Sequence, residues 1–138
     1  MTDSGGRGLL YFDSSAIVKL VSPEPESRAL HELVSRQGNV VASALATVEV
    51  QRAVRRIHGG ESMLDRAGDV LDRIALIKID DTILHKAAYL EPTDLRSLDA
   101  IHLATALSVQ EHLEAFVVYH RRLGEAAEAL GLNVESPS

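Results

Sequence analysis

The stretch Leu9-Leu-Tyr-Phe-Asp-Ser-Ser-Ala-Ile-Val-Lys-Leu-Val21 decides the fold of this chain. Its first four residues form a continuous apolar run, which is typical of a strand buried on both faces. Asp13 ends that run and can cap a helix, which we expect over residues 16–21. The stretch therefore predicts a buried strand that leads directly into a helix.

The same alternation continues along the rest of the chain. We expect further strands at 40–41, 76–79, 116–119 and 132–134, and further helices at 26–36, 43–57, 62–75, 82–90, 98–112 and 121–130, with Ser97 as the cap of the helix at 98–112. Strands that alternate with helices predict an α/β fold with a mainly parallel sheet wrapped by helices. Because no linker or repeat interrupts the pattern, we expect one domain over residues 9–135, preceded by a flexible lead-in at residues 1–8.

Composition limits the possible functions. The chain has 138 residues, of which 46% are hydrophobic and 4% aromatic, so its core must consist mainly of Leu, Val, Ile and Ala. The absence of cysteine excludes disulfides and thiolate chemistry. No apolar run approaches a membrane span or the core of a signal peptide, so we expect a cytoplasmic protein without membrane contact. The net charge of −6 is unusual for a nucleic-acid binder, which would need a divalent metal or a local arginine cluster to offset it.

Several polar residues follow directly after expected strands. In parallel α/β sheets, ligands gather beyond the carboxyl ends of the strands. Asp13, Ser43, Asp80 and His120 are therefore candidate site residues. For Asp13, a role as a helix cap alone is an equally good explanation.

Two further acids lie in apolar helical contexts. Glu49 is surrounded at helical spacing by Leu45 and Ala53, and Asp99 opens the apolar helix that continues to Leu107. Solvent contact could explain Glu49, and the helix dipole could explain Asp99. Three acids in such contexts also suggest a carboxylate cluster, and oxygen-rich sites of this kind suit Mg²⁺ or Mn²⁺.

Three segments carry a family resemblance. They are Tyr11-Phe-Asp-Ser-Ser-Ala-Ile-Val-Lys19, Arg96-Ser-Leu-Asp-Ala-Ile-His-Leu-Ala-Thr-Ala106 and Phe116-Val-Val-Tyr-His-Arg-Arg-Leu-Gly-Glu-Ala-Ala127. Each is similar to the corresponding segment of the PIN-domain ribonucleases, in particular the VapC-type toxins of bacterial toxin–antitoxin pairs. The likeness covers about residues 9–134, and the segment around Asp99 is its most specific part.

The resemblance implies a PIN-like three-layer sandwich with a four- or five-stranded sheet, and the activity of a Mg²⁺- or Mn²⁺-dependent endoribonuclease. It implies metal-binding and catalytic roles for Asp13, Glu49 and Asp99, and a place at the substrate for the hydroxyl of Ser15, for which a first-turn helix position is an equally good explanation. Arg121 and Arg122 lie next to the expected site, and we expect one of them, with Arg121 as the candidate, to contact the substrate. The resemblance further implies an RNA substrate, a VapB-type antitoxin as partner, and a homodimer.

One position departs from the family pattern. The family usually has an acid after the closing strand, where this chain has His120. A neutral imidazole can still bind a metal, but it favours softer ions than a carboxylate does. The substitution is open to three interpretations: a tolerated variant with His120 as a ligand, an enzyme with altered metal preference, or a weakened or inactive enzyme.

Other functions are possible for parts of the pattern. Arg52, Arg55, Arg56 and His58 gather on one expected helix and form either a solvated face or a guide for RNA. His102 lies one turn after Asp99 and is expected to pack in the core.

Two other protein classes are excluded by missing motifs. A haloacid-dehalogenase phosphatase needs a second acid where Ser15 stands, and a dinucleotide-binding domain needs glycines after the first strand. The remaining alternative is a non-catalytic PIN module that binds RNA or a partner.

Overall fold

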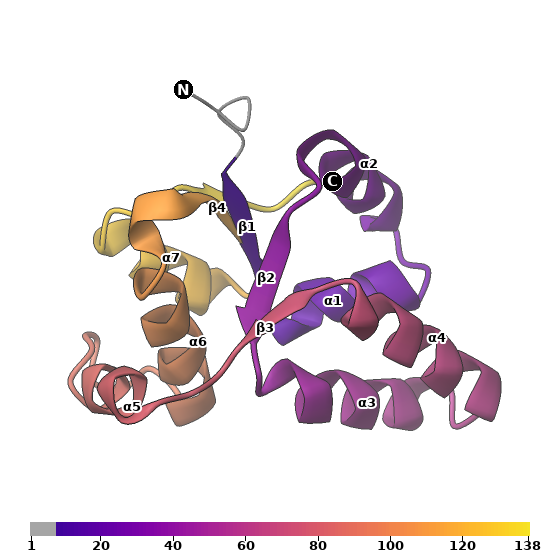
Figure 1. The fold of residues 1–138 in the computed structure, drawn as a ribbon, viewed down its shortest axis with the longest axis horizontal. Coiled ribbons are helices and arrows are strands. Elements are labelled where there is room, and N and C mark those ends of the chain that lie inside the picture. Colours follow the sequence, from indigo (N-terminus) through magenta and orange to yellow (C-terminus); the bar gives the residue numbers. More distant parts are fainter. Residues whose placement is uncertain (1–7) are drawn as a thin grey trace.

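The computed structural model describes residues 8–138, so most of the expected lead-in lies outside the described residues. Figure 1 shows a sheet between two groups of helices. The strands are β1 (Leu9–Phe12), β2 (Val40–Ser43), β3 (Ala75–Ile77), β4 (Leu113–Val117) and β5 (Val134–Glu135). The helices are α1 (Ser14–Val21), α2 (Ser27–Gln37), α3 (Ala46–Ile57), α4 (Glu61–Asp72), α5 (Asp81–Ala88), α6 (Ser97–Leu107), the 3₁₀ helix η2 (Gln110–His112) and α7 (Arg121–Ala129).

The sheet is fully parallel, with strand order β3-β2-β1-β4-β5. Helices α1 to α4 cover one face, and α6 and α7 cover the other (Figure 1). This is the predicted three-layer α/β sandwich, with five strands. The chain runs from β1 outward to β3, returns to β4 beside β1, and continues to β5, so the winding direction reverses between β1 and β4. In open α/β sheets, this reversal opens a crevice at the carboxyl ends of the strands.

Side-chain alternation along the central strand divides the core into two layers. Leu10 and Phe12 pack with the residues of α1 to α4, whereas Tyr11 packs with α6 and α7 on the opposite face. The ring of Tyr11 stacks on that of Phe116 from β4, with 5.3 Å between the ring centroids. Both faces of β1 are thus buried, which explains its uninterrupted apolar sequence.

Several elements differ in their bounds from the sequence-based expectation. The last long strand covers Leu113–Val117 rather than 116–119, because the expected helix at 98–112 already ends at Leu107. Ser97 is the first residue of α6 rather than its cap, and the N-cap residue Arg96 makes no side-chain capping bond. The polar residues 110–112, predicted as the end of the long helix, form the separate 3₁₀ helix η2.

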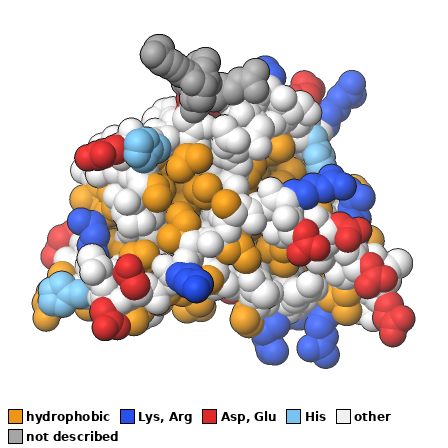
Figure 2. Space-filling view, in the orientation of Figure 1, with side chains coloured by type: hydrophobic (Ala, Val, Ile, Leu, Met, Phe, Trp, Pro, Cys, Tyr) orange, Lys and Arg blue, Asp and Glu red, His pale blue; other side chains and the backbone are white. Residues whose placement is uncertain are grey.

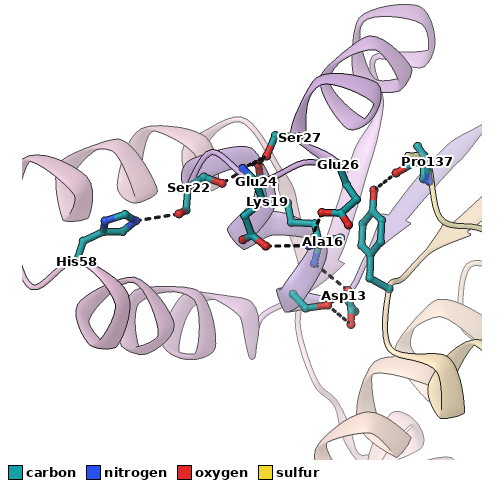
Figure 3. A network of polar contacts seen from close by, with 11 residues as sticks. Asp13, Ala16, Lys19, Ser22, Glu24, Glu26, Ser27, His58 and Pro137 are labelled. Carbon is teal, nitrogen blue, oxygen red and sulfur yellow. Dashed lines mark hydrogen bonds and ion pairs between the residues drawn. The ribbon is translucent and has the colours of Figure 1, made fainter.

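A network of polar contacts stabilises the position of α1 (Figure 3). Lys19 Nζ donates to Glu24 Oε1 at 2.9 Å and to Glu26 Oε1 at 3.0 Å, and it lies 4.8 Å from the centroid of the Tyr119 ring. The hydroxyl of Tyr119 donates to the carbonyl oxygen of Pro137. These contacts tie α1 to the start of α2 and to the C-terminal segment, so the helix that follows Asp13 is held from both sides.

The surface carries both charge and apolar area. On the face shown in Figure 2, hydrophobic side chains reach the surface in the middle, and acidic and basic side chains lie mostly towards the margins. Exposed large hydrophobic residues include Tyr89 and Leu98. None of the helices within residues 8–138 has the length and apolar character needed to cross a membrane.

The stacked pair at the centre of the sheet gives a first prediction. Phe116→Ala removes a fully buried ring and leaves a cavity against Tyr11, so we expect the free energy of unfolding to fall by about 3–5 kcal/mol. Urea denaturation measures this change. Tyr89→Ala is the control, because Tyr89 is 75% exposed and its removal should change the free energy by less than about 0.5 kcal/mol. Similar losses in both variants would contradict the assigned core.

Candidate active site

A hollow of about 610 Å³ lies where β1 ends and is lined by Asp13, Glu49 and Asp99, whereas the candidates Ser43 and Asp80 lie outside its lining. Its lining includes Asp13, Glu49 and Asp99 together with Ser14, Ser15, Arg56, Arg96, Ser97, Leu98, His102 and His120. Asp13 follows β1, Glu49 lies on α3, and Asp99 lies on α6. Three elements that are distant in sequence therefore bring carboxylates to one place beside the reversal between β1 and β4.

Asp13 is the most deeply buried acid of the hollow, with 6% of its surface exposed. Its Oδ1 accepts hydrogen bonds from the backbone N–H of Ala16 at 3.0 Å and from Ser15 Oγ at 2.9 Å (Figure 3). Burial raises the pKa of Asp13 above its ordinary value, and the nearby Asp99 raises it further, while these hydrogen bonds act in the opposite direction. Asp13 is thus a helix cap, as one interpretation of the sequence held, and also a desolvated carboxylate at the hollow.

Glu49 is held by two donors on a single oxygen. His102 Nε2 lies 2.7 Å from Glu49 Oε1, and Ser14 Oγ donates to the same atom at 2.6 Å. Burial alone would raise the pKa of Glu49, but the hydrogen bonds from His102 and Ser14 outweigh it and lower the pKa. Glu49 therefore remains ionised, with its carboxylate fixed between α1 and α6.

His102 continues this contact into the core. Its side chain is 3% exposed, and its Nδ1 lies 2.8 Å from the hydroxyl of Tyr11. Burial raises the pKa of Tyr11 well above its usual range, so the phenol keeps its proton. With a neutral imidazole, both contacts are satisfied when Tyr11 donates to Nδ1 and Nε2–H donates to Glu49.

Asp99 is half-buried in the first turn of α6, two residues after Ser97. An acid at this position also stabilises the helix dipole. Asp99 and Asp13 line the same hollow, and the negative charge of Asp99 contributes to the raised pKa of Asp13. The dipole explanation and a role at the site are therefore compatible.

His120 is exposed at the rim of the hollow and is the N-cap of α7. Its Nδ1 accepts the backbone N–H of Leu123 at 3.3 Å, as a capping carboxylate would. In a neutral imidazole whose Nδ1 accepts a bond, Nε2 carries the proton. A ligand role for His120 would therefore compete with this cap, and it remains a prediction.

The two predicted substrate contacts differ in their placement. Ser15 lines the hollow and donates to both Asp13 oxygens at 2.9 Å. Arg121 lies outside the lining and pairs with Glu125 at 3.3 Å along α7. Its role as a substrate contact stays a prediction that the geometry does not support directly.

Sequence reasoning did not assign to the site five residues that line the hollow: Ser14, Arg96, Ser97, Leu98 and His102. The spacing of three between Asp99 and His102 was a usable signal, because residues three apart lie on one helix face. Arg56 belonged to the arginine-rich part of α3, which the sequence left between a solvated face and an RNA guide. Nothing in the local sequence indicated that the hydroxyl of Ser14 would donate a hydrogen bond to Glu49.

The donor set fits a hard divalent cation in its chemistry. Carboxylate oxygens suit Mg²⁺ and Mn²⁺, and the burial of Asp13 beside Asp99 leaves negative charge that a cation would neutralise. Among residues 8–138, however, no three His, Asp or Glu side chains stand close enough together to hold an ion by themselves. The three carboxylates line one hollow without forming a ligand cluster in the described part of the chain, and their joint binding of one cation stays a prediction.

Fold and site together define a class: an α/β protein with an acidic hollow at the carboxyl edge of a parallel sheet. The model of the PIN domain matches residues 10–128. Ribonuclease VapC46 of Mycobacterium tuberculosis is 43% identical over 129 residues, which cover 94% of this chain and 98% of the relative. This chain belongs to the PIN-domain family, as its sequence motifs predicted.

Solved structures agree on the fold. VapBC2 from Rickettsia felis, determined with a DNA fragment from its promoter, matches with a TM-score of 0.74 at 12% identity and covers 94% of this chain and 99% of the other. VapC20 of Mycobacterium tuberculosis, described as a sarcin–ricin loop cleaving toxin, matches with a TM-score of 0.68 at 13% identity and covers 89% and 95%. At these identities, the likeness shows the shared architecture.

The buried carboxylate gives a second prediction. Because the pKa of Asp13 is higher in the folded than in the unfolded chain, the free energy of unfolding falls as the pH rises from the unfolded pKa to the folded pKa, and this loss stays constant at higher pH. Asp13→Asn keeps a capping oxygen without the charge. We therefore expect it to raise the free energy of unfolding of the metal-free protein at pH 7.5.

A matched control exists in α5. Asp80 is an exposed N-cap that accepts the N–H of Ile83 at 2.9 Å, so Asp80→Asn keeps the same kind of cap without relieving burial. Its free energy of unfolding, measured in urea with a chelator present, should stay within about 0.5 kcal/mol of the parent protein. Equal stabilisation by both variants would contradict the penalty assigned to Asp13.

Proposed function

We propose that this chain is a metal-dependent endoribonuclease, the toxin of a type II toxin–antitoxin pair, which hydrolyses RNA phosphodiester bonds with Mg²⁺ or Mn²⁺. One observation carries the proposal: Asp13, Glu49 and Asp99 line a single hollow at the carboxyl edge of the sheet. Relatives named Ribonuclease VapC, matched along nearly the whole chain, support it.

The residues that line the hollow have two kinds of role in the proposed hydrolysis: some bind the cation and others orient its ligands. Asp13, Glu49 and Asp99 would supply the oxygen ligands of the cation. When bound, a divalent cation supplies Lewis acidity and neutralises charge on the phosphate. Ser15 keeps the Asp13 carboxylate oriented, and Ser14 does the same for Glu49. In-line attack by water would leave a 5′-phosphate and a 3′-hydroxyl.

Two arginines make the acidic hollow compatible with RNA. Arg56 at the end of α3 and Arg96 at the start of α6 both line it. Their guanidinium groups can form paired hydrogen bonds with phosphate oxygens. They supply the local positive charge that a chain of net charge −6 needs in order to bind a polyanion. The sarcin–ricin loop specificity in the name of VapC20 supports structured RNA as the substrate class.

A VapB-type antitoxin is the proposed partner, because the similar structures include toxin–antitoxin complexes. We further propose a homodimer that acts in the cytoplasm, where RNA and antitoxin are present. The exposed apolar side chains offer surface for either contact: Val48, Ile57, Leu76, Leu84, Tyr89, Leu98 and Leu130.

The second candidate function is a weakened or inactive PIN module that acts by binding. The capping bond of His120 favours it, because an imidazole engaged with Leu123 replaces the usual fourth acid. The three remaining carboxylates at one hollow favour catalysis, since burying acids costs free energy that a binding role would not require. Toxicity on expression that Asp13→Ala relieves would distinguish the enzyme from the binding module.

A nuclease assay on structured RNAs, with Mg²⁺ and Mn²⁺ titrated in parallel, tests the proposed activity. We expect cleavage with either ion and none with a chelator. Asp99→Asn should lower the rate on the order of 100-fold, because it removes charge where the transition state needs a cation held. Asp94→Asn is the control, because Asp94 pairs with Arg122 at 2.6 Å outside the lining of the hollow. Cleavage that persists unchanged in chelator would overturn the proposal.

The role of position 120 gives a separate prediction. His120→Asp adds a carboxylate at the rim, and we expect Mg²⁺ affinity to rise about tenfold because affinity follows ligand charge. His120→Asn caps α7 comparably but adds no charge, so its Mg²⁺ affinity should match that of the parent protein. Calorimetric titration of the three proteins measures this. If the Asp and Asn variants bind Mg²⁺ equally well, position 120 does not belong to the metal site.

A further inference from the structure

Glu49 is the acid of the hollow whose orientation depends most on other side chains. It lies on α3, and 26% of its side chain is exposed. A glutamate with three rotatable side-chain bonds loses rotamer freedom when it is fixed, so a single orientation requires specific partners. Ser14 and His102 are those partners.

Both partners bind the same oxygen. Ser14 Oγ and His102 Nε2 lie 2.6 Å and 2.7 Å from Oε1, and within residues 8–138 Oε2 has no hydrogen-bond partner. The carboxylate is thus anchored on one side, which leaves its other oxygen available to the hollow that Glu49 lines. A ligand oxygen held in this way needs little reorganisation when a cation binds.

The orientation of His102 is fixed by a second contact, at the ring nitrogen that does not contact Glu49. The hydroxyl of Tyr11 on β1 holds Nδ1 at 2.8 Å, and the Tyr11 ring meets the imidazole edge-on with 6.1 Å between centroids. The chain of contacts runs from β1 through α6 to α3, so it joins the three elements that carry Asp13, Asp99 and Glu49. Both ring nitrogens of this buried histidine have partners, and one of the two contacts reaches an acid of the hollow.

We propose that His102 is a positioning residue of the active site, which fixes Oε1 of Glu49 through Nε2 and presents Oε2 to the divalent cation. This inference rests on the proposed function, because it assumes that Glu49 binds the cation. It extends that function to a buried residue three positions from Asp99 that does not itself contact the cation. The Tyr11 hydroxyl and Ser14 complete the support.

Two substitutions of His102 separate positioning from packing. The side-chain nitrogen of Gln overlays Nε2 of histidine, so His102→Gln keeps the donor to Glu49. Asn ends near the position of Nδ1, so His102→Asn keeps a partner for Tyr11 but cannot reach Glu49. Both variants remove the imidazole ring, and both should lower stability by similar amounts.

The measurement is Mn²⁺ affinity by calorimetric titration, together with urea denaturation and the kcat and KM for RNA cleavage. We expect His102→Asn to weaken Mn²⁺ binding about 10- to 100-fold and to lower kcat with little change in KM, whereas His102→Gln should stay within about threefold of the parent affinity. Equal Mn²⁺ affinity in the Asn variant and the parent would overturn the inference, and so would equal losses in Asn and Gln.

Ser14→Ala provides a second test if a His102 variant fails to fold. It removes the other donor on Oε1 from a half-buried position, so we expect a smaller but measurable loss of Mn²⁺ affinity, about threefold to tenfold. Unchanged affinity would contradict the anchoring of Oε1. Absence of both Mn²⁺ binding and cleavage in the parent protein would instead overturn the proposed function, while parent binding with unaffected variants overturns only the role of His102.

Discussion

The structure depends on holding carboxylates out of water at one end of a parallel sheet. Burying an ionised group costs free energy unless hydrogen bonds or opposite charge compensate it. Here the backbone N–H of Ala16 and the hydroxyl of Ser15 compensate Asp13, and Ser14 and His102 compensate Glu49. The compensation is incomplete at Asp13, because burial raises its pKa despite these hydrogen bonds.

Strand β1 and helix α6 each position one carboxylate of the site and one side chain that supports the site. Strand β1 leads directly into Asp13 and carries Tyr11 two residues earlier, on the face of the sheet that α6 covers. Helix α6 carries Asp99 and, one turn later, His102. A shift of either element would therefore displace an acid and its support together. This double use explains why the site can be built from short strands without a dedicated loop.

The sequence predicted the local parts of this arrangement better than the distant ones. The bounds of β1, the capping by Asp13 and the parallel α/β class follow from a short apolar run and one acid, because they depend on neighbouring residues. The His102–Glu49 contact joins residues 53 positions apart, and no local pattern encodes such a partner. The apolar sequence around His102 predicted that this residue packs in the core, and its burial confirms the prediction. The sequence could not show which groups the two ring nitrogens contact. The sharing of one oxygen by two donors is likewise a property of packing alone.

The two edges of the sheet are short. Strand β3 has three residues and β5 has two, and Lys78 follows β3 directly. An edge strand presents unpaired N–H and C=O groups that can recruit strands from other chains, and short edges flanked by charge limit this recruitment. The fold is thereby protected against edge-to-edge aggregation even when copies accumulate, so any assembly it enters must use side-chain surfaces rather than an extension of the sheet.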